Sequence, residues 1–211
     1  PPRRQRRGTV QELAALLTAA RQLRLRSVRA ALMLVIYGGG QRQADLLKAQ
    51  PSDFSRMPLQ LVGMAAPRPF LVWQVTRNKR GNEGALVITA AAAPVLRLQL
   101  RLAAARGLPL IFDEGTGAAY SPRLFWKRWE AVRAQAAQSV PSVASLQWRD
   151  LRRTFANLAR AGGASIDDVG DAIGNTAAKD EGLRQVYMAA QLETSARATL
   201  AVPALPRKGA A

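Results

Sequence analysis

Apolar residues recur at helical spacing along most of the chain and predict a mainly helical domain. Thr9 and Glu12 have the spacing of a capping box, which predicts a helix from there to about Leu23. Its inward face is expected to carry Leu13, Leu16 and Leu17. Ser27 can cap a second helix that runs to Tyr37, where three consecutive glycines end it.

Two apolar stretches, residues 70–76 and 85–89, have the composition of β-strands. Residues 77–84 would form the hairpin loop between them, and the turn-rich segment 51–69 is expected to hold one short strand near residues 59–64. These elements predict an α+β fold, in which a mainly helical domain carries a small three-stranded antiparallel sheet on one side.

The second half of the chain predicts further helices. One covers residues 90–106 and ends at Gly107, and Ser121-Pro122 is a typical start for the next. The apolar stripe after that start is interpreted as core rather than as a platform for stacking bases; it consists of Phe125, Trp126, Trp129 and Val132. Residues 111–120 and 139–145 are expected to be a loop and a linker.

The stretch from Trp148 to Leu158 places three arginines at the start of a predicted helix. Leu151, Phe155 and Leu158 would bury one stripe, and the arginines would lie on or near the opposite face; they are Arg149, Arg152 and Arg153. One guanidinium group can bind two phosphate oxygens at once and stays charged, so this cluster is typical of a phosphate site. A solvated basic face is the alternative.

Helical spacing fades at both ends of the chain. We expect one domain over residues 9–202, a basic arm or linker at residues 1–8, and a disordered tail at residues 203–211. A chain that begins with proline rather than methionine also suggests a preceding domain.

Composition narrows the function. The 211 residues include 31 Lys and Arg but only 14 Asp and Glu, and the resulting net charge of +17 indicates a polyanionic partner. The longest apolar run, residues 30–37, is too short to cross a membrane, and no signal peptide is evident. The chain has no Cys and no His, which fits a reducing compartment and excludes thiol chemistry and the commonest metal ligands. No metal or cofactor is therefore expected.

Five segments in order resemble the catalytic domain of the tyrosine recombinases, the phage-integrase family. The stretch 39–47, with Arg42 after two glycines and Asp45 three residues later, is similar to the family's first box. Lys79 matches its hairpin lysine, and the stretch 149–156 is similar to its second box. Ile173-Gly174-Asn175 falls at its Leu-Gly-His box, and Tyr187 at its nucleophile.

The resemblance implies DNA strand cleavage and rejoining through a 3′-phosphotyrosine intermediate. Arg42 and Arg152 would clamp the phosphate, Tyr187 would attack it, and Lys79 would protonate the departing 5′ oxygen. Arg149 and Asn175 stand where the family has histidines, and neither can shuttle a proton. The alternative is therefore a catalytically degenerate DNA-binding protein of the same fold.

The resemblance also implies the partners. These are double-stranded DNA, an upstream core-binding domain outside this chain, and further copies of the protein in a tetramer of paired protomers on DNA. The expected location is the cytoplasm, at the nucleoid of a bacterium, for a bacterial or phage-encoded protein. A basic RNA-binding or ribosome-associated protein would explain the charge but not the order of the motifs.

Overall fold

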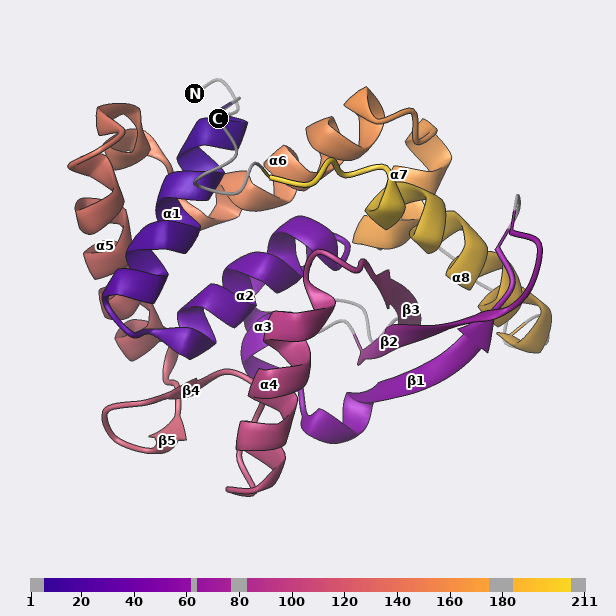
Figure 1. Cartoon of the computed structure of the whole chain (residues 1–211), viewed down its shortest axis with the longest axis horizontal. Coiled ribbons are helices and arrows are strands. Elements are labelled where there is room, and N and C mark those ends of the chain that lie inside the picture. Colours follow the sequence, from indigo (N-terminus) through magenta and orange to yellow (C-terminus); the bar gives the residue numbers. More distant parts are fainter. Residues whose placement is uncertain (1–5, 62–63, 77–82, 175–183, 206–211) are drawn as a thin grey trace.

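Helix α2 (Arg26–Tyr37) lies at the centre of the fold, with the other helices packed around it (Figure 1). The computed structural model describes residues 6–61, 64–76, 83–174 and 184–205, without the side chains of residues 184–191. The helix begins at Arg26, so the predicted cap at Ser27 is wrong. Instead, the buried Ser27 Oγ accepts hydrogen bonds from Gln99 Nε2 at 2.8 Å and from the backbone N–H of Phe112 at 3.4 Å.

Seven other α-helices surround α2 in the described part of the chain. The capping box at Thr9 and the helix start at Ser121-Pro122 are confirmed. The remaining helices are α1 (Val10–Gln22), α3 (Gln43–Lys48), α4 (Ala93–Ala104), α5 (Pro122–Ala137), α6 (Trp148–Ala161), α7 (Ile166–Ile173) and α8 (Arg184–Leu200), with short 3-10 turns η1 (Pro51–Asp53) and η2 (Pro141–Ser145).

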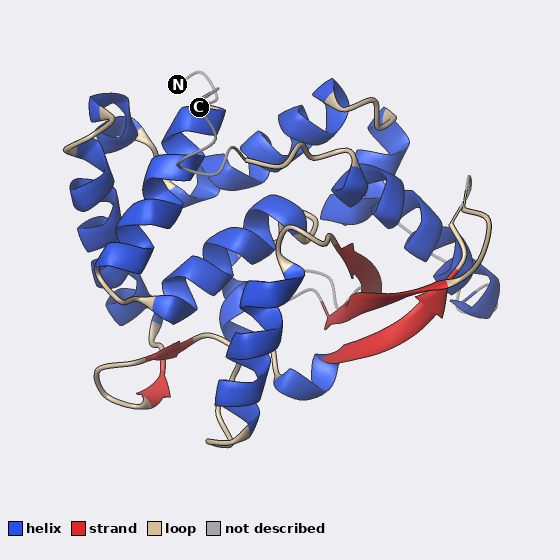
Figure 2. Ribbon diagram, in the orientation of Figure 1, coloured by secondary structure: helices blue, strands red, loops and turns tan. Residues whose placement is uncertain are grey.

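A three-stranded antiparallel sheet lies at one side of the helices (Figure 2). Its order is β1 (Phe54–Leu59), β2 (Arg68–Thr76) and β3 (Glu83–Ile88), and Trp73 pairs with both Phe54 and Leu86. The predicted α+β fold with a small three-stranded sheet is confirmed. The first strand was placed too late in the chain, because β1 ends at Leu59 rather than beginning there.

A second, two-stranded sheet joins β4 (Phe112–Asp113) to β5 (Ala118–Ala119), where the sequence predicts only loop. The turn of this hairpin is held by Asp113, whose carboxylate accepts the backbone N–H of Thr116 at 3.0 Å and the Arg128 Nε–H at 2.9 Å. Arg128 belongs to α5, so the hairpin is tied to that helix.

Helix α8 docks on the sheet of its own chain. Ser195 Oγ donates to the backbone carbonyl of Ala85 in β3 at 2.8 Å, and Leu192 and Ala196 pack against Val72 and Val87. Arg197 forms an ion pair with Asp168 of α7 at 2.8 Å. The apolar positions toward the C-terminus therefore have partners within this molecule, apart from Leu200, which is exposed.

Gly39 and Gly40 bring the end of α2 into contact with α6 and α7. Both have positive φ values, +85° and +62°, in the region that favours glycine. A Cβ on Gly40 would lie 2.8 Å from the ring of Phe155, and one on Gly39 would lie 3.1 Å from the carbonyl oxygen of Ala172. These two glycines therefore allow close approach of the protein's own helices.

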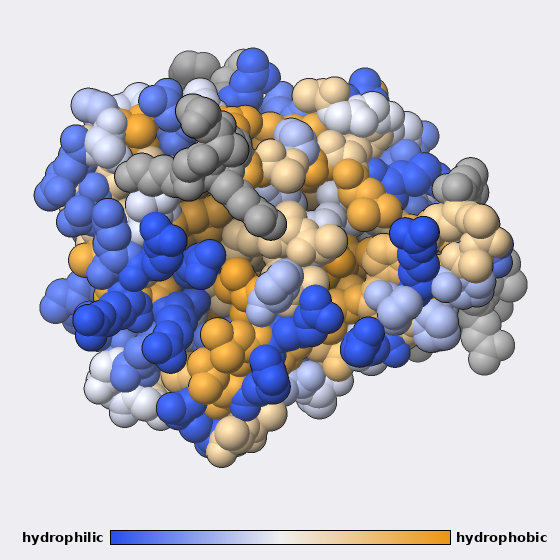
Figure 3. Space-filling view, in the orientation of Figure 1, coloured by the Kyte–Doolittle hydropathy of each residue, from blue (hydrophilic) through white to orange (hydrophobic). Residues whose placement is uncertain are grey.

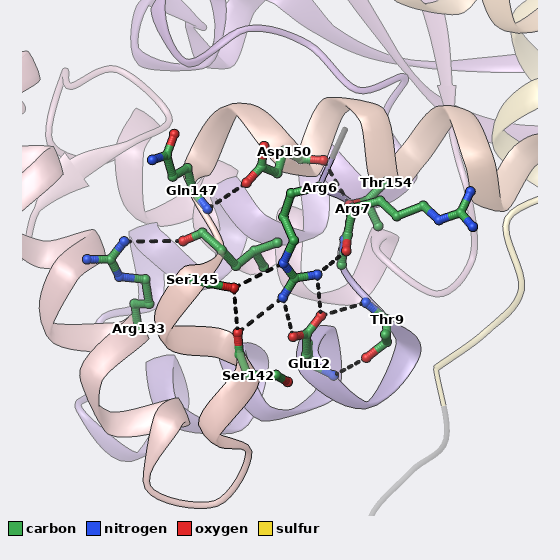
Figure 4. Close-up of polar contacts among 12 residues, drawn as sticks. Arg6, Arg7, Thr9, Glu12, Arg133, Ser142, Ser145, Gln147, Asp150 and Thr154 are labelled. Atoms are coloured by element: carbon green, nitrogen blue, oxygen red, sulfur yellow. Dashed lines mark hydrogen bonds and ion pairs between the residues drawn. The ribbon is translucent and has the colours of Figure 1, made fainter. Parts of the chain in front are cut away.

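Residues 6–8, predicted to belong to a basic arm or linker, pack against α1, α6 and η2 (Figure 4). The Arg6 guanidinium pairs with Glu12 and donates to Ser145 Oγ and to the backbone carbonyl of Ser142, both at 3.1 Å. The backbone N–H of Gly8 donates to Thr154 Oγ1 at 2.7 Å. This segment, here called the N-terminal strap, fastens the start of α1 to α6.

Glu12 is the buried acid of the strap, with 1% of its surface exposed. Burial raises the pKa of its carboxyl, but hydrogen bonds from Arg6, Ser142 and the backbone of Thr9 outweigh that effect, so the pKa lies below its ordinary value. A carboxyl with a lowered pKa in the folded state stabilises the fold above its unfolded pKa, and this contribution is lost as the pH falls through the folded value.

We expect Gly40→Ala to destabilise the domain more than Gly107→Ala. Both glycines have φ +62°, but a Cβ at Gly107 meets nothing within 4 Å, whereas at Gly40 it meets Phe155. Gly107→Ala should cost about 1 kcal/mol for the backbone alone, and Gly40→Ala about 2–4 kcal/mol because the overlap is added. Urea unfolding of both variants measures this difference, and equal losses would contradict the contact.

We expect Glu12→Gln to lower the free energy of unfolding at pH 7 by about 1–3 kcal/mol, because the charged bonds to Arg6 are lost. The gap between wild type and variant should close as the pH falls below about 4.5, since the wild-type carboxyl then becomes protonated. Denaturant unfolding across that pH range is the measurement. Glu130→Gln, at a half-exposed pair with Arg133, is the control and should change little; a gap that does not close would contradict the assignment.

Candidate functional site

The start of helix α6 positions two of the predicted site arginines. Gln147 caps the helix, and its backbone N–H donates to the Asp150 carboxylate at 2.9 Å. Leu151 and Phe155 are fully buried and hold one face of the helix in the core. The helix therefore begins at a fixed place, and Arg152, one position after Leu151, is only half-buried.

The Arg152 side chain joins three segments that are far apart in the sequence. Its Nη1 donates to the backbone carbonyl of Gly40 at 2.9 Å, and its Nη2 donates to that of Ile173 at 2.6 Å. A guanidinium is planar and carries five N–H donors, so two carbonyl acceptors fix its orientation. The segments that resemble the first, second and third family boxes thus meet at this one side chain.

A pocket of about 570 Å³ opens where α3, α5 and α6 meet. Arg42, Arg149 and Arg152 all line it, so the structure brings together three of the six predicted site residues. The other lining residues are Gln41, Gln43, Ala44, Trp126, Gln147 and Trp148. We call this the arginine pocket. Arg42 comes from the N-cap of α3, more than a hundred residues before the two arginines of α6.

The described residues that line the arginine pocket include three arginines and no Asp or Glu. Among the described residues, neither Arg42 nor Arg149 forms an ion pair within 4.0 Å. Asp45, which the sequence places where it could orient Arg42, is buried, with 3% of its surface exposed. The N-terminus of α6, at the same wall, adds the positive end of a helix dipole. The pocket is therefore suited to an anion.

Arg153, the third arginine of the predicted cluster, has a structural role. Its Nη1 donates to the backbone carbonyl of Arg6 at 3.2 Å and lies 3.8 Å from the Asp150 carboxylate. It connects α6 to the N-terminal strap and does not line the arginine pocket.

Three predicted site residues cannot be placed by their side chains. Lys79 and Asn175 lie outside the described residues. The backbone of Tyr187 belongs to α8, and its side chain is outside the description. Their roles therefore stay predictions from the order of motifs.

The other two tyrosines of the chain belong to the core. Tyr37 is 2% exposed, and its hydroxyl donates to the backbone carbonyl of Pro203 at 3.3 Å and accepts the backbone N–H of Leu205 at 3.1 Å. Tyr120 is 7% exposed. Burial raises the pKa of both hydroxyls, and at Tyr120 the negative charges of Glu114 and Asp113 raise it further. Neither has the access or the acidity of a nucleophile.

None of the other six residues that line the arginine pocket, Trp126 among them, was predicted as a site residue. Trp126 was assigned to the core with its neighbours, and Phe125, Trp129 and Val132 are indeed fully buried. Trp126 is 41% exposed. The sequence did hold a signal for this exposure. Trp126 directly follows the buried Phe125, and adjacent residues of a helix point about 100° apart, so both cannot face the core equally.

Positive charge also extends over the surface outside the pocket. Hydrophilic side chains gather over the turn between α1 and α2 and beside α4 (Figure 3). Exposed arginines there include Arg21, Arg24 and Arg26. Burial and the nearby charge of Arg21 lower the pKa of Arg29 on α2.

The described residues form no group of three or more acidic, His or Cys side chains in a metal-binding arrangement. No described helix has both the length and the apolar sequence of a membrane span.

The chain shares its fold with a recombinase of known structure. The crystal structure of XerA recombinase superposes with a TM-score of 0.62 over 99% of this chain and 68% of that chain. The two sequences are 18% identical, so the likeness concerns the fold alone. No protein-family model and no curated protein matches the sequence.

Proposed function

We propose that this domain binds double-stranded DNA and cuts and rejoins its strands through a 3′-phosphotyrosine intermediate. The observation that carries the proposal is the arginine pocket, where Arg42, Arg149 and Arg152 converge from two distant segments. The fold shared with XerA recombinase supports the same reading. The order of the five motifs along the chain supports it independently.

Arginines suit the charge changes of phosphodiester cleavage. Negative charge on the non-bridging oxygens grows as phosphorus becomes five-coordinate, and preorganised cations stabilise that state more than the ground state. Arg152 is held in place by Gly40 and Ile173 before any substrate arrives, so no reorganisation is required of it. In this proposal Arg42 and Arg152 clamp the two oxygens, and Arg149 adds a third cation.

Tyr187 is the proposed nucleophile. Its phenol oxygen forms a bond to phosphorus as the bond from phosphorus to the 5′ oxygen breaks, and the phenol proton is given up to the surroundings. Lys79 gives a proton to the departing 5′ oxygen. The burial of Tyr37 and Tyr120 favours Tyr187 by elimination, since the chain has three tyrosines.

Arg149 and Asn175 limit the rate in this mechanism. Neither side chain can accept the proton of the attacking phenol, because arginine stays charged and an amide has no basic nitrogen. The same replacements support the second candidate, a DNA-binding protein of this fold without catalysis. The proposed partners are other protomers on DNA, as a tetramer of pairs, and an upstream core-binding domain.

We expect duplex binding to weaken steeply with salt, and Arg42→Ala to weaken it further and flatten its salt dependence. Each lost phosphate contact should reduce the slope of log K against log salt by about one. Fluorescence anisotropy with a labelled duplex at several salt concentrations provides the measurement.

Arg101→Ala is the matched control for charge. Arg101 is exposed on α4 and does not line the arginine pocket, so its loss should have the smaller effect. A flat salt response of the wild type, or equal effects of the two variants, would argue against the pocket as the phosphate site.

We expect a covalent protein–DNA adduct on nicked duplexes, in which the short cleaved fragment diffuses away and traps the intermediate. Because the target sequence is unknown, the substrate is a nicked duplex library with randomised sequence, and the adduct is detected on a denaturing gel. Tyr187→Phe should abolish the adduct while duplex affinity stays nearly unchanged, since only the nucleophilic oxygen is removed.

Tyr120→Phe is the matched control for loss of a phenol oxygen. Its hydroxyl is buried and outside the arginine pocket, so this variant should still form the adduct. An adduct that persists in Tyr187→Phe would sink the assignment of the nucleophile. Intact duplex binding with no adduct in the wild type would favour the non-catalytic alternative.

A further inference from the structure

Trp126 has no assigned role in the proposed chemistry, although it lines the arginine pocket. It is the exposed member of the chain's four tryptophans: Trp73, Trp129 and Trp148 are at most 4% exposed, against 41% for Trp126. Within the described part of the chain, its ring stacks on no other aromatic ring and no cation. An indole that lines the pocket with 41% of the residue's surface exposed thus offers contact area to a ligand.

The pocket is larger than a phosphate group requires. Its volume of about 570 Å³ falls within the range of roughly 300–1,000 Å³ that is typical of sites for whole small molecules. Its lining has a charged part and an apolar part, as a nucleotide has a phosphate and a base. The arginines offer charge for the phosphate, and Trp126 with Ala44 offers apolar surface. The additional space therefore fits the sugar and base attached to that phosphate.

A base can reach an indole face only if it leaves the double helix. In a duplex each base is stacked on both sides and paired, so its π-face is covered. In a single strand the face is open, and stacking of a base on an aromatic side chain favours binding without regard to sequence.

We propose that Trp126 is a stacking platform for an unpaired base next to the phosphate that the arginines hold. This inference rests on the proposed function, since it assumes a DNA strand in the pocket, and it adds that the strand is locally unpaired there. It also identifies Trp126 as a DNA-binding residue that the order of family motifs does not include.

Two single-stranded probes of equal length separate the base from the backbone. One is oligothymidylate, and the other is an abasic oligomer that keeps every sugar and phosphate but has no bases. The wild-type protein should bind the first about tenfold more tightly than the second. Stacking should also quench the fluorescence of Trp126.

Trp126→Ala should bind both probes with the affinity that the wild type has for the abasic oligomer, and Trp126→Phe should keep part of the preference. Leu98→Ala removes a comparably exposed apolar side chain from α4, away from the pocket, and should keep the full preference. Circular dichroism checks that the variants are folded.

Equal affinity of the wild type for the two probes would overturn the platform, as would a full preference in Trp126→Ala. In either case, steep salt-dependent binding to duplex DNA would leave the proposed function standing, because that binding depends on the arginines. A wild-type protein that binds neither the single strands nor the duplex would overturn both proposals.

Discussion

The hydrogen bonds of Arg152 to two backbone carbonyls hold the candidate site together. The guanidinium contacts Gly40 after α2 and Ile173 at the end of α7, while its own helix is anchored in the core by Leu151 and Phe155. Because these bonds go to main-chain atoms, they fix the backbone path of both segments. A bond to a side chain would fix only the rotamer of that side chain. Arg42 lies two residues after Gly40, so the same hydrogen bonds also determine its position. Arg152 thus positions Arg42 although the two positive charges repel each other.

Elements with local signals were predictable from the sequence. The capping box at Thr9 and the proline after Ser121 act within one helical turn, and each helix begins where they indicate. Strand β1 has no such signal: it contains Pro58, alternates poorly, and exists because β2 pairs with it. The small β4–β5 hairpin likewise depends on contacts of Asp113 with Arg128 of a later helix, which no local pattern reveals.

The candidate site was predictable only as far as residue types and their order allow. The convergence of Arg42 with Arg149 and Arg152 follows from the resemblance, and the pocket agrees with it. The exposure of Trp126 depends on how distant segments pack, and the periodicity of the sequence assigned this residue to the core instead. The carbonyl partners of Arg152 depend on the same packing, and no pattern in the sequence indicates them. The N-terminal strap was missed for a similar reason, since a run of arginines and prolines is typical of disorder unless a buried acid such as Glu12 receives it.

The attachment of α8 through Ser195 has a mechanical consequence for the segment that carries Tyr187. Ser195 is bonded to β3, and Arg197 is bonded to α7, so the helix is clamped toward its C-terminal end. Tyr187 lies on the same helix about 12 Å along the axis from Ser195, at 1.5 Å per residue. A tilt of roughly 10° about the contact with the sheet would therefore move the backbone of residue 187 through about 2 Å. In the proposed reaction, a shift of that size would take the tyrosine out of its productive geometry, so the packing of α8 on β3 would set its distance from the phosphate.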